Sequence, residues 1–350
     1  LNTPRWRKAS RDCSRTRTRA PMDPISQAFA GATFSQSLTR TNTGQKTAFI
    51  VGALSGMAAD LDVLVRSDHD PLLFLEFHRQ FTHSLIFIPL GALICATILF
   101  LLLRRRTRFS RIYLYSLLGY ATHGLLDACT SYGTQLLWPF SDSRIAWDII
   151  SIIDPLFTVP VMILVIIGTV TNRQGFPRAA LCYGLAYLAL GQVQHDRAMT
   201  ALQTLAEERG HTPVNATVKP TLANLYLWKL IYEYDGQYHV DAARIGLHAE
   251  FIEGDVVSSR IATDKLMAGP LQTRDIERFR WFSDGYIAHY PGNPLLIGDI
   301  RYSLLPNRVE PLWGIRLKPE TKYEHVDFVT TRNLTNHTGR KFIDMLFSDM

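Results

Sequence analysis

The most constraining feature of the sequence is a run of twenty uncharged, mostly apolar residues, Ser84–Leu103, which ends at three arginines (104–106). Twenty residues of helix span about 30 Å, the thickness of the hydrocarbon core of a bilayer. Two further uncharged runs, Pro155–Thr171 and Ala179–Gln194, hold seventeen and sixteen residues. One such run could be a buried helix of a soluble protein, but several close together predict a membrane bundle.

Two other runs are less apolar because they contain ionisable residues. Thr47–Val65 contains Asp60 and Asp62, and Ile112–Leu126 contains His123. Ionisable groups inside membrane spans are costly and usually have a function. With these two runs, the sequence predicts about five spans in an α-helical polytopic membrane domain that covers residues 22–195.

The character of the sequence changes near residue 195. Asp196–Arg209 has the mixed charged and apolar pattern of an amphipathic helix. Six short strand-like runs separated by turn residues follow it: 225–232, 237–240, 280–288, 294–304, 313–317 and 324–330. We therefore predict a soluble α+β domain over residues 196–350. Its tryptophans (Trp228, Trp281 and Trp313) are expected in the core rather than on a lipid-facing surface.

The positive charge of the chain is confined to one end. The whole chain has a formal charge of +6, and residues 1–21 hold seven Arg or Lys against one Asp, so the remainder is neutral. This arm has no apolar run and is therefore not a secretory signal peptide. It is either a basic arm that binds phosphate groups or an extension upstream of a true start at Met22, which we favour. We accordingly expect no nucleic-acid partner.

The ionisable residues of the apolar segments gather at one membrane level. They come from four separate segments: Asp60, Asp62, His78, His83, His123, Asp127, Asp148 and Asp154. His123 and Asp127 are four residues apart, so they share one helix face and can hold one ion. Asp60 and Asp62 can both point inward only at a helix end, where the chain turns.

Imidazole and carboxylate groups together favour a divalent metal ion. Zinc and manganese are the first expectations, iron is compatible, and magnesium fits less well. A bound ion would lower the pKa of a water and supply a nucleophile, with Asp127 or Asp154 as a possible general base. Thr82 is expected to cap a helix that begins near His83, and this helix start with Arg79 would suit a phosphate group.

Each of these residues also has a purely structural interpretation. A lone histidine such as His123 can be a hydrogen-bonded packing group. Asp154 can cap the helix that Pro155 begins, and Asp148 can lie in a solvated loop. The joint occurrence of so many polar groups in apolar segments nevertheless favours a metal site.

Several stretches of this sequence carry a family resemblance. They are Met22–Ala28, Ala59–Asp62, the HRxxTHS element His78–Ser84, the HxxxD element His123–Asp127, Thr130–Phe140 and Asp154-Pro155. With these, the chain resembles the YdjM-like inner-membrane metal-dependent hydrolases of bacteria over about residues 22–195. This chain has Gln27 where some members have histidine, so Gln27 is not counted among the ligands.

The resemblance implies a metal-dependent hydrolase of the bacterial inner membrane, with phospholipase-like activity suggested for the family. By position it implies one ligand set, Asp60, Asp62, His78, His83, His123 and Asp127, with Arg79 as a clamp for the substrate. Our leading hypothesis is hydrolysis of a phosphoester, on a lipid-like or other small-molecule substrate in contact with membrane lipid. The alternative is a non-catalytic membrane protein that senses or conducts ions, with an outer domain that binds a partner.

Loop charges predict the orientation of the spans, because cytoplasmic loops are enriched in Lys and Arg. The loop 104–111 holds five arginines and the loop 172–178 holds two, so both are expected in the cytoplasm. Two spans separate these loops, which makes the two assignments consistent. Counting from them places the N-terminus in the cytoplasm and residues 196–350 outside the membrane.

Reporter fusions after Gly210 test this orientation. Alkaline phosphatase joined there should be active and green fluorescent protein should be dark, because the first folds outside the membrane and the second inside. Fusions within the loop 104–111 should give the opposite pattern. Fluorescence after Gly210 would reverse the topology.

Overall fold

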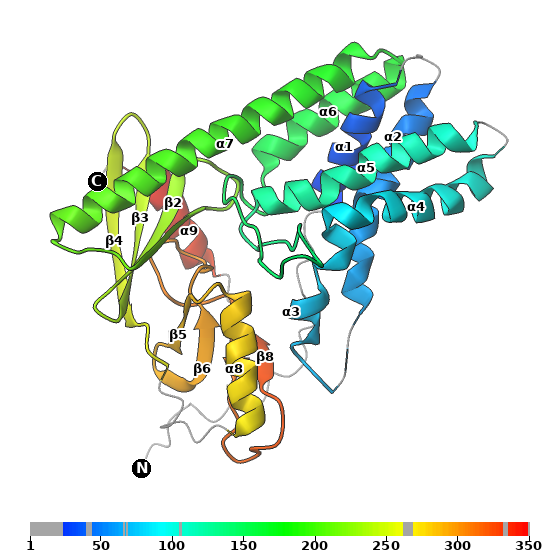
Figure 1. Ribbon diagram of the computed structural model, residues 1–350. Coiled ribbons are helices and arrows are strands. Elements are labelled where there is room, and N and C mark those ends of the chain that lie inside the picture. The colour runs from blue at the N-terminus through cyan, green and yellow to red at the C-terminus, as the bar shows by residue number, and fades with distance from the viewer. Residues whose placement is uncertain are drawn as a thin grey trace.

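The computed structural model describes residues 24–348 except 40–43, 66, 68, 105–106, 262–268 and 332–334. The predicted basic arm, residues 1–21, therefore lies outside the described residues. A bundle of helices forms one end of the molecule, and two antiparallel sheets form the other (Figure 1). The long helix α7 (Gly175–Glu208) belongs to both parts.

The bundle is built from helices that follow one another along the first half of the chain. Before α7 they are α1 (Pro24–Ser37), α2 (Gln45–Met57), η3 (Ala58–Leu64), α3 (Leu73–Phe77), η4 (Phe81–His83), η5 (Leu85–Phe87), α4 (Ile88–Leu103), α5 (Phe109–Cys129) and α6 (Pro155–Thr171). A long segment without regular helix, residues 130–154, joins α5 to α6.

The first half of the chain is helical, as predicted, but the predicted number of five spans is not confirmed. Among the described residues, two stretches are long and apolar enough to cross a bilayer, Gln45–Leu64 and Leu85–Leu103, and α6 is apolar but shorter. α5 is less apolar because it carries polar side chains, and two of these, His123 and Asp127, are completely buried. Polar groups that face the interior of a bundle avoid the cost of lipid contact.

Glycines allow α1, α2 and α5 to pack closely. A Cβ atom at Gly119 of α5 would lie 2.5 Å from the carbonyl oxygen of Gly52 on α2. A Cβ atom at Gly56 would lie 2.7 Å from the carbonyl oxygen of Gln27 on α1. Small residues at helix crossings let the backbones approach each other more closely than a Cβ atom would allow. The close approach brings the end of α2 beside the polar face of α5.

The second half of the chain forms two four-stranded meanders, each antiparallel throughout. The first contains β1 (Asn215–Pro220), β2 (Leu227–Tyr234), β3 (Gln237–Ile245) and β4 (Ala249–Ser258). The second contains β5 (Ile287–Tyr290), β6 (Asn293–Asp299), β7 (Trp313–Arg316) and β8 (Asp327–Thr330). Two helices accompany them, α8 (Pro270–Phe282) and α9 (Asn336–Phe347).

The predicted α+β character is confirmed, with differences in detail. The run 280–288 was expected as a strand, but α8 continues to Phe282 and β5 begins at Ile287. Phe279 and Phe282 are three residues apart, so both face the core from one side of the helix. β1 and β4 were not predicted, because their exposed polar residues obscure the alternation of apolar and polar side chains that marks a strand. The predicted domain boundary after residue 195 lies inside α7.

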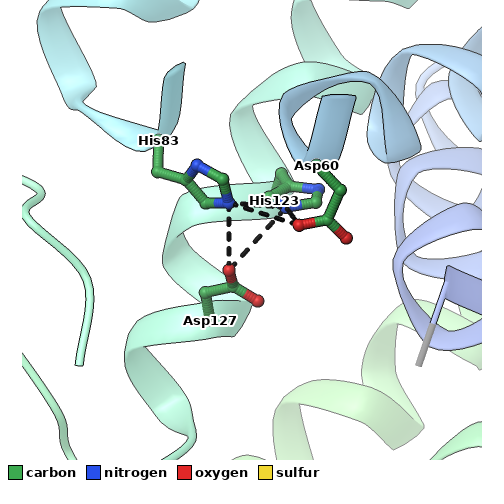
Figure 2. A group of neighbouring side chains, drawn as sticks. All are labelled: Asp60, His83, His123 and Asp127. Atoms are coloured by element: carbon green, nitrogen blue, oxygen red, sulfur yellow. Dashed lines mark hydrogen bonds and ion pairs between the residues drawn. The ribbon is translucent and has the colours of Figure 1, made fainter. Parts of the chain in front are cut away.

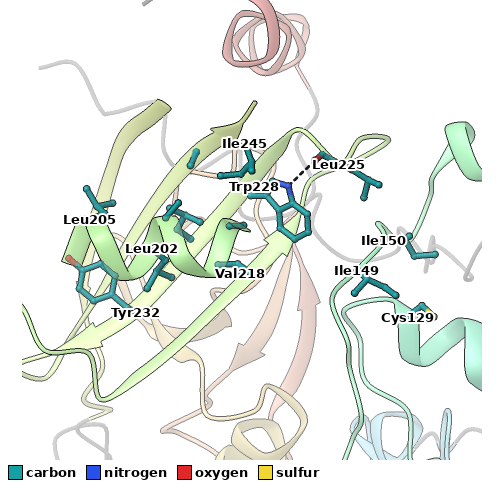
Figure 3. Close-up of a cluster of buried hydrophobic side chains, with 14 of the residues drawn as sticks. Cys129, Ile149, Ile150, Leu202, Leu205, Val218, Leu225, Trp228, Tyr232 and Ile245 are labelled. Atoms are coloured by element: carbon teal, nitrogen blue, oxygen red, sulfur yellow. Dashed lines mark hydrogen bonds between the residues drawn. The ribbon is translucent and has the colours of Figure 1, made fainter. Parts of the chain in front are cut away.

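The second half of α7 covers the first sheet. Leu202 and Leu205 pack against Trp228 and Tyr232, which are completely buried (Figure 3). Trp313 is also buried, in the core under the second sheet. The expected core position is thus confirmed for these two tryptophans.

Loops of the bundle pack directly on the sheet domain. Ile149 and Ile150, from the segment 130–154, join the core beside Trp228 (Figure 3). Next to them, a buried ion pair joins Asp148 Oδ2 to Lys219 Nζ at 2.7 Å. On the other side, Arg278 of α8 pairs with Asp70 at 2.8 Å, just before α3. These contacts hold the sheet domain against the end of the bundle where α5 finishes.

A buried lysine makes the stability of the sheet domain depend on pH. Lys229 Nζ is buried and donates to Ser303 Oγ and to the carbonyl oxygen of Arg308, both at 2.7 Å. Burial lowers the pKa of Lys229 to about 7. An unfolded lysine keeps its proton up to about pH 10.4, so unfolding takes up a proton between these values. Stability should therefore rise with pH above 7.

We expect the free energy of unfolding, relative to Lys229→Met, to increase between pH 7 and pH 9 by about 2 kcal/mol at most. The variant removes the titrating group while keeping a similar apolar stem. Tryptophan fluorescence of the full chain in detergent, followed during denaturant unfolding, measures the difference. An equal difference at both pH values would contradict the expected role of Lys229.

Candidate metal site

Four side chains from three elements converge inside the bundle. Asp60 comes from η3, His83 from η4, and His123 and Asp127 from α5 (Figure 2). His83 Nε2 lies 3.0 Å from His123 Nε2 and 3.2 Å from Asp127 Oδ2. His123 Nε2 lies 3.3 Å from Asp60 Oδ1. The two remaining His–Asp separations are 3.6 and 3.7 Å, and all four ligand atoms lie within 4.8 Å of one another.

These separations fit a metal ion. In a tetrahedral zinc site with bonds of about 2.0–2.1 Å, ligand atoms are about 3.3 Å apart. The five separations given above lie on either side of that value. An octahedral ion also fits if the two carboxylates are on opposite sides, where they would be about 4.2 Å apart. The four residues could therefore bind a divalent ion, and their arrangement suits zinc and manganese alike.

Two carboxylate oxygens in the cluster lack a hydrogen-bond donor in the described part of the chain. Asp60 Oδ1 and Asp127 Oδ2 are buried and accept no hydrogen bond from the described residues. A buried carboxylate oxygen without a donor is costly, and a cation between the four groups would satisfy both oxygens.

The protein orients both imidazole rings toward this point. His123 Nδ1 bonds to the carbonyl oxygen of Gly56, which can only accept, so the ring proton lies on Nδ1. His83 Nδ1 lies 2.9 Å from the hydroxyl of Thr82, and that hydroxyl donates to Asp62 Oδ2. The hydroxyl therefore accepts from His83 Nδ1. Both Nε2 atoms are left with a lone pair, which is how metal-binding histidines are usually held.

Asp127 is oriented from two sides. Gln27 Nε2 donates to Asp127 Oδ1 at 2.6 Å, which leaves Oδ2 for the cluster. Arg79 Nε lies 3.3 Å from that Oδ2. Gln27 was not predicted to be a ligand, and in the structure its amide supports a ligand instead. Its place in the family motif, where some members have histidine, was the feature of the sequence that pointed to this position.

Arg79 has an uncommon backbone conformation. Its φ is 66°, in the left-handed region, where non-glycine residues are rare and often mark functional sites. Its N–H donates to Asp62 Oδ2 at 3.0 Å, and its carbonyl oxygen accepts from Gln135. The guanidinium is buried and lies over the ring of Tyr132. These contacts hold Arg79 in place beside Asp127, and the role of Arg79 as a substrate clamp stays a prediction.

The predicted cap at Thr82 is wrong. The helical turns there, η4 and η5, have three residues each and no side-chain cap, and α4 begins later, at Ile88, also without one. The Thr82 hydroxyl is instead engaged by Asp62 and His83. The expected anion site at a helix start near His83 is therefore absent from the described residues.

A second group of ligand atoms adjoins the first. Asp60, Asp62 and His78 also offer ligand atoms within 4.8 Å of one another, so Asp60 belongs to both groups. Asp62 Oδ1 lies 2.7 Å from His78 Nδ1. α2 tightens into η3 at this point, and both Asp60 and Asp62 face the site as expected for a helix end.

The two remaining aspartates lie in neither group. Asp154 caps α6, accepting from the backbone of Leu156 and Phe157 and from Tyr187, as its structural interpretation suggested. It lines a cavity of about 20 Å³, room for one water, which Asp127 also lines. Its role as a general base stays a prediction. Asp148 is not solvated, since it is paired with Lys219.

Comparison with known proteins agrees with the resemblance. The profile described as "YdjM inner membrane protein" matches residues 22–198, just over half of the chain. The chain belongs to the YdjM inner membrane protein family. The matched region contains every residue of both ligand groups. It ends inside α7 and leaves most of the sheet domain outside the family match.

Two curated relatives match part of the chain. Inner membrane protein YbcI of Escherichia coli (strain K12) is 37% identical over 107 residues, 29% of this chain and 60% of YbcI. Uncharacterized protein YfhP of Bacillus subtilis (strain 168) is 30% identical over 109 residues, 31% of this chain and 33% of YfhP. The chain thus spans about a third of one and three fifths of the other. No solved structure matches it. The family and the name of YbcI support an inner-membrane location.

A buried glycine offers a test that changes no ligand. A Cβ atom at Gly124 would lie 2.3 Å from the carbonyl oxygen of His83, whereas Gly175 has no atom within 4 Å. Gly124→Ala should displace His83 and lower metal affinity at least about 10-fold, as the loss of a supporting contact does. His83→Ala should remove the ion completely.

Metal content of the purified protein, by mass spectrometry after dialysis, measures both effects. Gly175→Ala is the matched control and should keep the native metal content. If His83→Ala retains stoichiometric metal, the assignment of the ligands is wrong.

Proposed function

We propose that this YdjM family member is a membrane-bound hydrolase that uses a divalent ion, zinc or manganese first, to cleave a phosphoester. The observation that carries the proposal is the convergence of His83, His123, Asp60 and Asp127 at the spacing of metal ligands. Buried ionisable groups that gather in an apolar environment are typical of catalytic sites.

A divalent ion at such a site lowers the pKa of a bound water and polarises a phosphoryl oxygen. Hydrogen bonds within the chain hold the ligands of the site in fixed orientations. Gly56, Thr82 and Gln27 hold His123, His83 and Asp127 in place, so that the ligands do not have to reorganise. Arg79 places a positive charge beside Asp127 and is the chain's candidate to meet an anionic substrate.

A lipid-like substrate is supported by the surface around the site. The accessible members of the cluster are Asp60, with 22% of its side chain exposed, and His78, with 28%. Exposed apolar side chains flank them along the chain, Leu61 and Leu64 on η3 and Leu85 and Ile86 after His83. Apolar surface beside a polar mouth is suited to admit a lipid from the bilayer.

The orientation in the membrane is part of the proposal. The arginine-rich loops lie in the cytoplasm, and the sheet domain and the site lie at the outer face. Membrane lipid is then the nearest source of phosphoesters.

A non-catalytic role remains the second candidate, and one observation favours it. His83, His123 and Asp127 are completely shielded from solvent, as ligands of structural or sensing ions often are. In that case the ion would stabilise or signal, and the sheet domain would bind a partner.

Hydrolysis of phospholipids by the purified protein in mixed micelles tests the proposal. Activity should be lost on chelation and restored by zinc or manganese, and His123→Ala should lower kcat/KM at least about 100-fold because a ligand is lost. His337→Ala, on exposed α9, is the control and should retain activity. Stoichiometric metal without turnover on a broad ester panel would instead support the ion-sensing role.

A further inference from the structure

We propose that the cluster holds two ions, with a second, open site formed by Asp60, Asp62 and His78 at its mouth and Asp60 shared between the sites. This inference rests on the proposed metal site and deepens it. It divides the residues that family resemblance treats as one ligand set into a closed site and an open one.

The positions of the ligand atoms carry the first step. Asp60 belongs to both groups of atoms that lie within 4.8 Å of one another. Its Oδ1 faces His83 and His123, while its second oxygen points away from them (Figure 2). A carboxylate that offers one oxygen to each side is the usual bridge between two ions, which in hydrolytic sites lie about 3.5–4 Å apart.

Coordination number separates the two sites. We call the closed site, with Asp60, His83, His123 and Asp127, the inner site, and the open site, with Asp60, Asp62 and His78, the outer site. The inner site has four protein ligands, which complete the shell of a tetrahedral ion and leave no position for water. The outer site has three protein ligands, the number found in catalytic zinc sites. If hydrolysis needs an open position, the outer site is the one that supplies it.

Solvent exposure agrees with this division. The side chains of His83, His123 and Asp127 are 0% exposed, and so is that of Asp62, whereas those of Asp60 and His78 are 22% and 28% exposed. The outer site is therefore reached past Asp60 and His78. Water and a phosphate group can therefore reach the outer site without moving the inner ligands.

Hydrogen bonds orient Asp62 as a ligand of the outer ion. Its Oδ2 accepts from the backbone of Arg79 and from Thr82, which locks the carboxylate in one orientation. Its Oδ1 faces only His78 among the described hydrogen-bond partners, so a lone pair is left for an ion. The same carboxylate thus braces the inner site through Thr82 and contributes directly to the outer one.

The net charge of the cluster indicates which ligand would bind together with the outer ion. Asp60, Asp62 and Asp127 contribute three negative charges and Arg79 one positive charge, so with neutral histidines the cluster carries −2. One divalent ion neutralises it, and a second leaves +2. That excess matches a phosphate dianion, so the outer ion should bind more weakly alone and more tightly with phosphate present.

Manganese binding to the full chain in detergent tests this. We expect two ions per chain in the presence of inorganic phosphate, with the spin-coupled resonance signal of a neighbouring pair. Without phosphate, the affinity of the second ion should fall at least 10-fold. His78→Ala should bind one ion and show an uncoupled signal, and the retained inner ion would prove that the variant is folded.

His69→Ala is the matched control, because His69 is an exposed histidine of the same segment and should leave both ions in place. One ion per chain in the native protein, or two in His78→Ala, would overturn the second site. Two coupled ions without any hydrolysis would refute the proposed function and leave the second site standing, whereas hydrolysis with one ion would do the reverse.

Discussion

The geometry of the metal cluster depends on the hydrogen bond between His123 Nδ1 and the carbonyl oxygen of Gly56. This bond requires the end of α2 to lie against α5, which the glycines at their crossing permit. It also determines which nitrogen of His123 carries the proton. Because Nε2 is then left to face Asp60, Asp127 and His83, one interhelical contact sets both the packing and the chemistry of the cluster.

The sheet domain supports the cluster from outside the bundle. Tyr132 stands between Arg79 and two aromatic residues of that domain, Tyr302 and Trp313, with ring separations of 5.1 and 5.4 Å. Asp148 and Lys219 form a buried ion pair across the same boundary. Breaking such a pair from one side is strongly destabilising, so the two parts are expected to keep their relative position. The segment 130–154 is held in this way between the site and the sheets.

Much of the candidate site could be predicted from sequence. His123 and Asp127 share a helix face by their spacing, and Asp60 and His83 stand out as ionisable residues next to long apolar runs. The division into two groups could not be predicted, because it depends on whether a carboxylate faces one histidine or another across separate helices. The supporting roles of Gln27 and Gly56 were not predicted for a related reason. A backbone carbonyl carries no sequence signal, and an amide becomes a supporting group only beside its carboxylate.

The sequence by itself determined that the first half of this chain is a helical membrane bundle with buried acids and histidines, and that the second half is α+β. Apolar run length and charge placement carry that information, because they reflect the cost of moving groups out of water. Tertiary structure decided how many helices meet the length and apolarity of a span, that α7 crosses the domain boundary, and which ligand atoms meet. Those outcomes depend on contacts between residues far apart in sequence, which local patterns do not specify.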